Sequence, residues 1–454
     1  MLAGIAVAWN AGRVVEKVLY WRFGAEVHAP SYPPPRDAAE AQRQDLDRLA
    51  ALTRIDRSFS PGAAEQFRQR IAALRERAGT LDRAGFLLAV SEAVALARNA
   101  HTNVDQRAWR VQLASVPVRF EWFAEGLFVV RARAEGVPLL GAHVLEVDGA
   151  APEAYVDTMA RFVGGTHEYA RTSSLVLLES PEALHALDAH APADRLRLRV
   201  ADAAGVERTV EIPVLPPPQP PALPKPGRLY SPIPLEGEEG WRTLLDPAAT
   251  LPCSLREPAK VMHAERLDPA TLYMHLWQVR DLEGEPPLAR TMREALGADR
   301  DPRWRRIVLD LRFDAGGDYP AVFNGIARMG RRLAPDGKLL VLTDNTTFSA
   351  AIIAAALARH FAGPRATLVG ERPGDALAFW AEGSSFILPN SKLRILTSTG
   401  YHDWAHGCRE LRCYWLNFWY DVGVGSVEPQ VPAAWRFADY RRGVDSVLAR
   451  ALER

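Results

Sequence analysis

The segment LPPPQPPALPKPG at residues 215–227 constrains the fold most, because consecutive prolines hold the backbone near polyproline II. Before it, over residues 109–214, apolar residues alternate with a period of two, which is typical of strands. After it, over residues 236–454, strand patterns alternate with helix patterns, which indicates a largely parallel sheet flanked by helices. We therefore predict a linker at 215–235 between a β-rich domain and an α/β domain.

A helical region precedes the β-rich domain. Over residues 38–108, apolar side chains recur at helical spacing, and turn signals divide them into two or three helices that end shortly before His101. Residues 1–37 form a separate N-terminal segment. Its apolar run from Leu2 to Trp9 is too short to span a bilayer. It is either the remnant of a longer signal or anchor, or an amphipathic helix that packs on the body.

Composition excludes some functions. The 55 basic and 55 acidic side chains give a formal net charge of zero, so no sequence-wide field attracts nucleic acid. Three cysteines are too few for a disulfide framework, and no Cys/His spacing resembles a zinc site. Cys408 and Cys413 could close a small disulfide in an oxidising compartment; two free thiols are the equal alternative.

Local patterns within the domains identify several elements. Residues 144–149, followed by a helix near Pro152, look like the strand, turn and helix of a PDZ-like or related β-rich module. RLRLRVAD and RTVEIPVL predict a pair of strands around an Ala-Gly turn. In the α/β region, RRIVLDLRF and KLLVLTD predict buried strands, and FILPNSKLRILTST predicts a hairpin that turns at Pro389 and Asn390.

Two strand-to-helix junctions carry the candidate chemistry, because ligands bind at the carboxyl ends of parallel strands. In IVLDLRFDAGGDYP, the glycines Gly316 and Gly317 allow a sharp turn whose amides could bind an oxyanion; a structural turn is the alternative. In LVLTDNTTFSAAIIAAALARHF, Ser349 lies at a helix start, where the N–H of Ala350 could join the oxyanion hole. The alternative for Ser349 is a simple N-cap.

The order of these motifs resembles the S41 peptidase family, which contains the C-terminal processing proteases and the tricorn core protease. The motifs are DLRFDAGG, TDNTTFSA, LVGERPG, LPNSKLRI and VEPQVPAAWRFADYRRGVDSVLARAL. The resemblance covers roughly Tyr273 to Leu452 and extends upstream to the helices that end at His101 and to GAHVLEVDG. It implies a ClpP/crotonase-like catalytic domain, with a helical segment and a PDZ-like domain before it.

The resemblance also implies roles for single residues. Ser349 falls on the family's nucleophile, and Ala350 with Gly317 or Gly316 on its oxyanion donors. Processing proteases use a lysine about 25 residues after the serine, but GERPGDALAF contains none. The tricorn-like branch uses a histidine from a preceding segment, and His101 falls on it; a neutral imidazole is a suitable base for a serine hydroxyl.

The sequence departs from the family pattern around this base. Ala100 precedes the histidine where relatives have serine or glycine, and Asp314 replaces an asparagine next to the glycines. Gly423 stands near the position of the glutamate that orients the histidine in the family. The closest acid before it is Asp421, which we expect to hold the imidazole, and Glu428 lies inside the motif itself. His360, His402 and His406 are the fallback bases.

The hypothesis is a serine peptidase in which Ser349 forms an acyl-enzyme and His101 is the base. The alternatives are a non-catalytic ligand- or peptide-binding protein on the same fold, and a hydrolase of small esters or amides. No metal or organic cofactor is implied. We expect a peptide or protein substrate, no nucleic acid, and membrane association through the N-terminus as an open alternative. A periplasmic or membrane-associated location is favoured over a cytoplasmic one.

Overall fold

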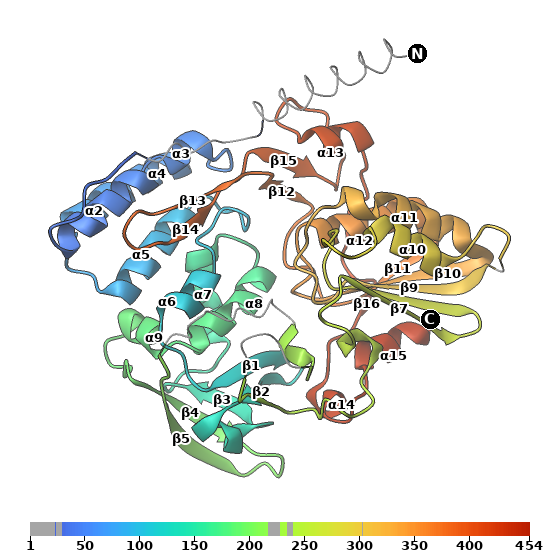
Figure 1. The fold of residues 1–454 in the computed structure, drawn as a ribbon, viewed down its shortest axis with the longest axis horizontal. Coiled ribbons are helices and arrows are strands. Elements are labelled where there is room, and N and C mark those ends of the chain that lie inside the picture. The colour runs from blue at the N-terminus through green and yellow to red at the C-terminus, as the bar shows by residue number, and fades with distance from the viewer. Residues whose placement is uncertain (1–22, 24–29, 217–227, 234–238, 302) are drawn as a thin grey trace. The chain divides into compact units, whose positions relative to one another are not determined.

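The computed structural model describes residues 23, 30–216, 228–233, 239–301 and 303–454, which form two compact units (Figure 1). The division is as follows: unit 1 comprises Met1–Ala108, Arg161–Gly165 and Ala378–Asp421, and unit 2 comprises Trp109–Ala160, Thr166–Leu377 and Val422–Arg454. Most of the expected N-terminal segment 1–37 and most of the expected linker 215–235 lie outside the described residues.

Helices dominate the first part of unit 1. They are α2 (Ala38–Leu49), α3 (Leu52–Ile55), α4 (Pro61–Glu76) and α5 (Arg83–Ala95). Three of them begin at a side chain that accepts a backbone N–H, namely Asp37, Ser60 and Asp82. The sequence predicted two or three helices here. The structure has a fourth, the single turn α3, because the chain turns at Ala50 between two apolar stretches.

Two antiparallel strand pairs and a short helix complete unit 1. They are β12 (Ala378–Ala381) with β15 (Gly400–Asp403), β13 (Ser385–Ile387) with β14 (Arg394–Leu396), and α13 (Trp415–Tyr420). The second pair confirms the predicted hairpin. Its turn is held to α2 because the Asp45 carboxylate accepts the N–H groups of Asn390 and Ser391 at 2.7 and 2.8 Å. Cys408 and Cys413 form a disulfide before α13.

The first sheet of unit 2 is antiparallel, in the order β1-β2-β3-β4-β5 with β6 beside β2. Its strands are β1 (Val118–Phe123), β2 (Gly126–Ala132), β3 (His143–Val147), β4 (Arg195–Ala201), β5 (Glu207–Pro213) and β6 (Arg242–Thr243). The predicted β4–β5 pair is confirmed. The associated helices are α6 (Arg107–Gln112), α7 (Ala154–Val163), α8 (His167–Leu178) and α9 (Pro181–Leu187). Of these helices the sequence predicted only α7, because its alternating pattern indicated strands in the rest of this region. One helix that was not predicted, α8, begins where the Thr166 hydroxyl accepts the N–H of Tyr169.

The second sheet of unit 2 has the order β16-β11-β10-β9-β8-β7, and only the β7–β8 pair is antiparallel. Its strands are β7 (Met262–Asp268), β8 (Thr271–Leu276), β9 (Trp304–Asp310), β10 (Leu333–Thr343), β11 (Ala366–Gly370) and β16 (Val431–Pro432). The helices are α10 (Leu288–Leu296), α11 (Pro320–Arg332), α12 (Ala350–Ala362), α14 (Phe437–Tyr440) and α15 (Ser446–Leu452). Figure 1 shows α10, α11 and α12 on one side of this sheet and α15 on the other. This is the mixed α/β architecture that the alternating pattern predicted.

Unit 2 also contains short 3₁₀ helices, namely η1 (Ala134–Leu139), η2 (Arg228–Tyr230), η3 (Cys253–Leu255) and η4 (Gly363–Arg365).

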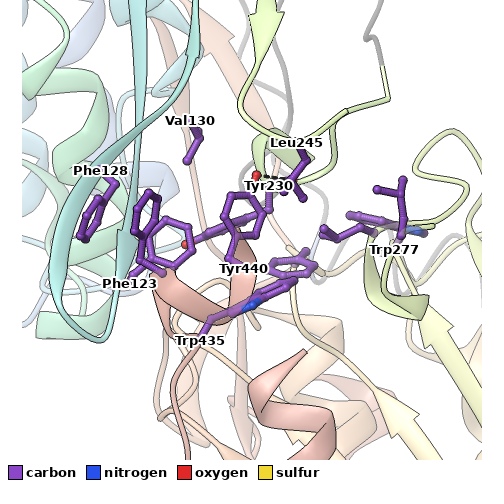
Figure 2. Packing of buried hydrophobic residues seen from close by; sticks show 12 residues of the cluster. Phe123, Phe128, Val130, Tyr230, Leu245, Trp277, Trp435 and Tyr440 are labelled. Carbon is purple, nitrogen blue, oxygen red and sulfur yellow. Dashed lines mark hydrogen bonds between the residues drawn. The ribbon is translucent and has the colours of Figure 1, made fainter. Parts of the chain in front are cut away.

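One aromatic cluster joins the two sheets of unit 2 (Figure 2). Phe123 from β1 meets the rings of Tyr230 and Tyr440 at centroid distances of 5.4 and 5.0 Å. The Tyr440 hydroxyl donates to the Tyr230 carbonyl at 2.8 Å, and the Tyr230 hydroxyl donates to the Trp122 carbonyl at 2.6 Å. Buried rings with satisfied hydroxyl groups therefore fix the first sheet to the second.

Candidate active site

Ser349 lies at the start of α12 in a strained backbone conformation. Its φ and ψ are 54° and −122°, a region that non-glycine residues rarely occupy. Its side chain makes no capping hydrogen bond to α12. A serine that only capped the helix would have extended backbone and an oxygen bonded to the N–H groups of the first turn. The conformation instead matches a sharp strand-to-helix turn.

The loop between β10 and Ser349 is rigidly held by Asp344. One oxygen of this buried carboxylate accepts the N–H of Thr346 at 2.9 Å and that of Thr347 at 3.0 Å. The hydroxyl of Thr347 donates to the Leu311 carbonyl at 2.9 Å, and the Phe348 N–H donates to the Asp314 carbonyl at 3.0 Å. The serine loop and the glycine loop after β9 are thus hydrogen-bonded to each other. We call these two loops, Asp314–Gly317 and Asp344–Ala350, the serine corner.

The glycines of the serine corner are required by close contact as well as by backbone conformation. A Cβ on Gly316 would lie 2.6 Å from the Cβ of Ser349 and 2.9 Å from the nitrogen of Ala350. A Cβ on Gly317 would lie 1.9 Å from the carbonyl oxygen of Val279. Their φ values are 99° and 147°. The predicted nucleophile and its predicted oxyanion groups are therefore adjacent in the structure.

The two glycine amides differ in what they can do. The N–H of Gly316 donates to Asp314 Oδ1 at 2.8 Å, so it is already used within the loop. Among the described residues, the N–H groups of Gly317 and Ala350 have no protein acceptor. Ala350 is the first residue of α12, where N–H groups have no partner in the helix. Of the three amides that the sequence suggested, Gly317 and Ala350 are the two that remain able to bind an oxyanion.

A buried ion network supports the strand that leads into this corner. Arg312 follows β9, and its guanidinium donates to Asp310 at 2.5 and 2.9 Å and to Asp445 at 2.7 and 2.9 Å. Tyr273 donates to Asp310 at 2.7 Å, and Ser254 donates to Asp445 at 2.6 Å. The two carboxylates raise the pKa of Arg312 well above its ordinary value. The Arg312 guanidinium therefore stays charged, and its hydrogen bonds fix the end of β9.

Two buried carboxyl groups, Asp344 and Glu121, and the half-buried Glu371 have raised pKa values. Burial raises the pKa of Asp344. Burial, with Asp344 nearby, raises the pKa of Glu371 to about 7. Burial raises the pKa of Glu121 to about 8; Arg110 opposes this rise, and the Glu179 and Asp344 charges add to it. At neutral pH, part of this cluster is therefore protonated.

His101 lies in unit 1, after α5, in a stack of three rings. Its imidazole lies 4.9 Å from the ring of Phe379 at an interplanar angle of 11°, and Phe379 lies 4.9 Å from the imidazole of His402 at 14°. Phe379 on β12 pairs directly with His402 on β15, so the two side chains share one face of this strand pair. We call His101, Phe379 and His402 the histidine stack.

The tautomer of His402 follows from its neighbours. The indole N–H of Trp404 donates to His402 Nδ1 at 3.3 Å, and an indole can only donate. Burial lowers the pKa of His402, so the ring is neutral and carries its proton on Nε2. That nitrogen lies 3.3 Å from Glu382 Oε1. The Trp404 indole thus holds one nitrogen of His402 and the Glu382 carboxylate lies beside the other, which positions the ring at the end of the stack.

Asp421 is the C-cap of α13, with left-handed backbone at φ 46°, and its carboxylate pairs with Arg409. The Arg409 guanidinium lowers the pKa of this carboxyl group. Ser349, Ala350, Gly316 and Gly317 belong to unit 2, and His101 and Asp421 belong to unit 1. The part played by Asp421 stays a prediction.

The sequence did not predict Phe379 and Glu382 as neighbours of the histidines. The pairing of β12 with β15 brings them together, and no local sequence motif indicates that pairing.

A search of solved structures found similar chains. Mature CPAF complexed with lactacystin matches with a TM-score of 0.57 and 13% identity, covering 89% of this chain and 96% of that chain. Mature CPAF alone matches with a TM-score of 0.56 and 14% identity, covering 89% of this chain and 95% of that one. The chain shares the fold of CPAF. The photosystem II D1 C-terminal processing protease matches with a TM-score of 0.37 and 14% identity, over 87% of this chain and 93% of that one.

Two other comparisons, with protein-family models and with curated proteins, found no match. Within the described residues, no group of three or more His, Cys, Asp or Glu side chains is arranged to hold a metal ion. No helix in that part of the chain is long and apolar enough to cross a membrane. At 13–14% identity, the likeness to CPAF describes the fold, and chemistry has to be argued from the serine corner and the histidine stack.

Proposed function

We propose that this chain is a serine peptidase of the S41 type, in which Ser349 is the nucleophile, His101 the general base, and Gly317 with Ala350 the oxyanion hole. One observation carries the proposal. Ser349 occupies a strained, non-capping conformation directly against Gly316 and the N–H of Ala350. Strain of this kind costs on the order of 1–3 kcal/mol and persists where the surrounding structure enforces it, which is typical of catalytic positions.

The proposed reaction follows from these groups. The Ser349 oxygen attacks the substrate carbonyl carbon while its proton passes to the imidazole of His101. The oxygen of the tetrahedral intermediate takes the negative charge and accepts hydrogen bonds from the Gly317 and Ala350 amides. The imidazolium then protonates the leaving amine, which departs and leaves an ester on Ser349. Water, deprotonated by His101, cleaves this ester and restores both side chains.

The histidine stack supports the proposed role of His101. A general base has to be held in one orientation, and serine peptidases with a histidine base usually hold it with a carboxylate. Here the imidazole lies flat against Phe379, which rests on His402. The face of an aromatic ring also attracts a cation, so Phe379 stabilises the imidazolium that forms during catalysis. We assign orientation of the base to this stack, with Asp421 retained as the candidate from the sequence.

The proposal extends to substrate and location. A peptide would bind as an extended strand next to the serine corner, with the antiparallel sheet of unit 2 as the PDZ-like domain and the parallel sheet as the ClpP/crotonase-like domain. The Cys408–Cys413 disulfide supports an oxidising compartment, such as the periplasm or the outer face of a membrane. Membrane association through the N-terminal segment is part of this proposal.

The proposal is tested by active-site labelling. A fluorophosphonate probe should label the wild-type chain and lose all labelling in Ser349→Ala, while Ser426→Ala, a serine outside the corner, should label normally. His101→Ala should label at least about 100-fold more slowly, because the hydroxyl has lost its base. Cleavage of a peptide library then separates a peptidase from an esterase. Absence of labelling in the wild-type chain would exclude an active serine and leave a binding protein.

A further inference from the structure

A pocket of about 560 Å³ lies at the end of α12 opposite Ser349. Its nine lining residues all belong to unit 2 and come from the last turn of α12, from η4 and β11, and from the loop before β16. Volumes of roughly 300–1,000 Å³ are typical of small-molecule sites. Since α12 has 13 residues and a helix rises about 1.5 Å per residue, roughly 20 Å of helix separates this pocket from the serine corner. We call it the α12 pocket.

The polar side chains of the α12 pocket can all donate hydrogen bonds, and none of them is acidic. They are Arg359, His360, Thr367 and Gln430. None of the nine lining residues is Asp or Glu. The acid nearest to Gln430 in the chain is Glu428, and it is paired with Arg372 at 2.7 Å. A pocket that carries a guanidinium and no carboxylate attracts anions.

The guanidinium of Arg359 is not used to hold the fold. Basic side chains in the last turn of a helix often serve its negative end, as Arg365 does when it donates to the Gly330 carbonyl of α11 at 2.8 Å. Arg359 lies in the last turn of α12, yet no described residue accepts a hydrogen bond or an ion pair from its side chain. Its planar fork of donors is therefore left for a ligand.

The amide of Gln430 has a fixed orientation. Its Oε1 accepts the N–H of Leu368 on β11 at 2.6 Å, just before β16 begins to pair with β11 at Val369. Because a backbone N–H needs an acceptor, the oxygen of the amide is the atom that faces Leu368. The Nε2 group keeps two N–H donors, and no described residue accepts from it. The sheet edge thus positions a donor that an anion would satisfy.

The number of donors favours a phosphate monoester over a carboxylate. A guanidinium, an imidazole, a hydroxyl and an amide together offer more donors than the two oxygens of a carboxylate can accept. A phosphate monoester has three terminal oxygens and a charge of about −1.5 to −2 near pH 7. The pocket is also larger than a phosphate group, and Pro364, Ala366 and Val424 give it an apolar wall for an organic body.

We infer that the α12 pocket binds a small organic phosphate monoester. Arg359 binds two phosphate oxygens through its fork, the Gln430 amide binds the third, and His360 and Thr367 donate further hydrogen bonds. The organic group lies against the apolar wall. This inference goes beyond the proposed hydrolase and does not depend on it, because no residue of the serine corner lines the pocket.

The test is isothermal titration of the full chain with phenyl phosphate at constant ionic strength, and we expect one saturable site. Gln430→Glu is the sharpest variant. It keeps the oxygen that accepts the Leu368 N–H and replaces the donor by a negative oxygen, so the affinity should fall at least about tenfold. Arg359→Met keeps the aliphatic stem, removes the charge and should cause a similar loss.

Arg331→Met is the matched control for Arg359→Met. Arg331 is an exposed arginine in the last turn of α11, it lies outside the pocket, and its loss should leave the affinity unchanged. Thermal unfolding followed by circular dichroism checks that each variant is folded. Benzoate tests the class of anion, because it keeps the ring and replaces the phosphate by a carboxylate; it should bind at least about tenfold more weakly.

Other outcomes overturn the inference. Phenyl phosphate binding that Gln430→Glu and Arg359→Met leave unchanged would place the anion at another site. An equal loss in Arg331→Met would show a general attraction to positive charge without a pocket. Equal affinity for benzoate would replace the phosphate by a carboxylate ligand. Absence of saturable binding to the wild-type chain would show that the donors of the α12 pocket serve only water.

Discussion

The serine corner is made by two consecutive strand-to-helix connections of one sheet, whereas the histidine stack is made by three segments far apart in the chain. Gly316 and Ser349 each follow a buried strand, and both strands belong to the parallel sheet of unit 2. His101 follows a helix, and Phe379 and His402 come from paired strands some 280 and 300 residues later. A site built from local turns can be read from sequence motifs, while a site built from distant pairings needs the structure. The four predictions below test this difference.

The largest effect is expected in the serine corner. Gly317→Ala places a Cβ 1.9 Å from the Val279 carbonyl oxygen, so the loop has to shift and its oxyanion amide moves with it. Loss of one oxyanion donor costs about 100- to 1,000-fold in kcat, and we expect at least that loss in hydrolysis of a fluorogenic substrate.

Gly425→Ala is the matched control for this substitution. Gly425 also has a positive φ, 73°, but its added Cβ meets no atom within 4 Å. It carries the backbone strain without the clash, so its activity should stay within about threefold of wild type, with thermal unfolding followed in parallel. Equal losses in the two variants would show that backbone strain, and not displacement of the Gly317 amide, lowers the activity.

The second effect concerns the support behind the corner. Arg312→Met leaves Asp310 and Asp445 buried without their cation, and removing one partner of a buried ion pair costs about 3–5 kcal/mol of unfolding free energy. Arg290→Met removes an exposed pair with Glu294 and should cost less than about 1 kcal/mol. Chemical denaturation measures both. A loss of unfolding free energy in Arg312→Met as small as that in Arg290→Met would mean that apolar packing alone fixes β9. The buried ion network would then not support the serine corner.

Much of the corner and of the α/β sheet was predictable from sequence. The apolar runs that form β9 and β10 each end in a recognisable turn motif. Paired glycines follow β9, a serine before small residues follows β10, and each motif restricts the backbone conformations that the turn can adopt. In the antiparallel region, α8 and α9 were not predicted, because the alternating apolar pattern of the surrounding segments indicated strands throughout. The conformation of Ser349 was not predictable, since an N-cap serine and a strained serine have the same sequence context.

The histidine stack was predictable only in its first member. His101 was found through the family pattern, but the stacking of Phe379 and the proton position on His402 depend on the pairing of β12 with β15. Asp421 was proposed as orienter because it was the nearest acid in the sequence; in the structure its carboxylate pairs with Arg409. The role of Asp421 as the orienter of His101 stays a prediction.

The third prediction uses the raised pKa of Glu121. Its folded-state pKa of about 8 lies above the ordinary value of 4.5, so the folded chain binds more protons than the unfolded chain between these values. Unfolding free energy should therefore fall as pH rises from about 5 to 8. Glu121→Gln removes this titration and should flatten the profile, with a change on the order of 2 kcal/mol. Thermal unfolding across this pH range measures it. An unchanged slope in Glu121→Gln would assign the pH dependence to Glu371 and Asp344 instead.

The smallest effect is expected in the histidine stack, where Phe379→Leu removes the aromatic face beside His101 and keeps most of the apolar volume. The imidazolium that forms during catalysis then loses a cation–π contact, and kcat/KM should fall about tenfold. Phe379→Tyr retains the ring and should restore kcat/KM. Phe386→Leu, at another buried phenylalanine of unit 1, controls for lost packing and should leave kcat/KM unchanged. An equal fall in Phe379→Leu and Phe386→Leu would show that Phe379 only packs against His101. The stack would then not stabilise the charge on the imidazolium, and the base would need a carboxylate.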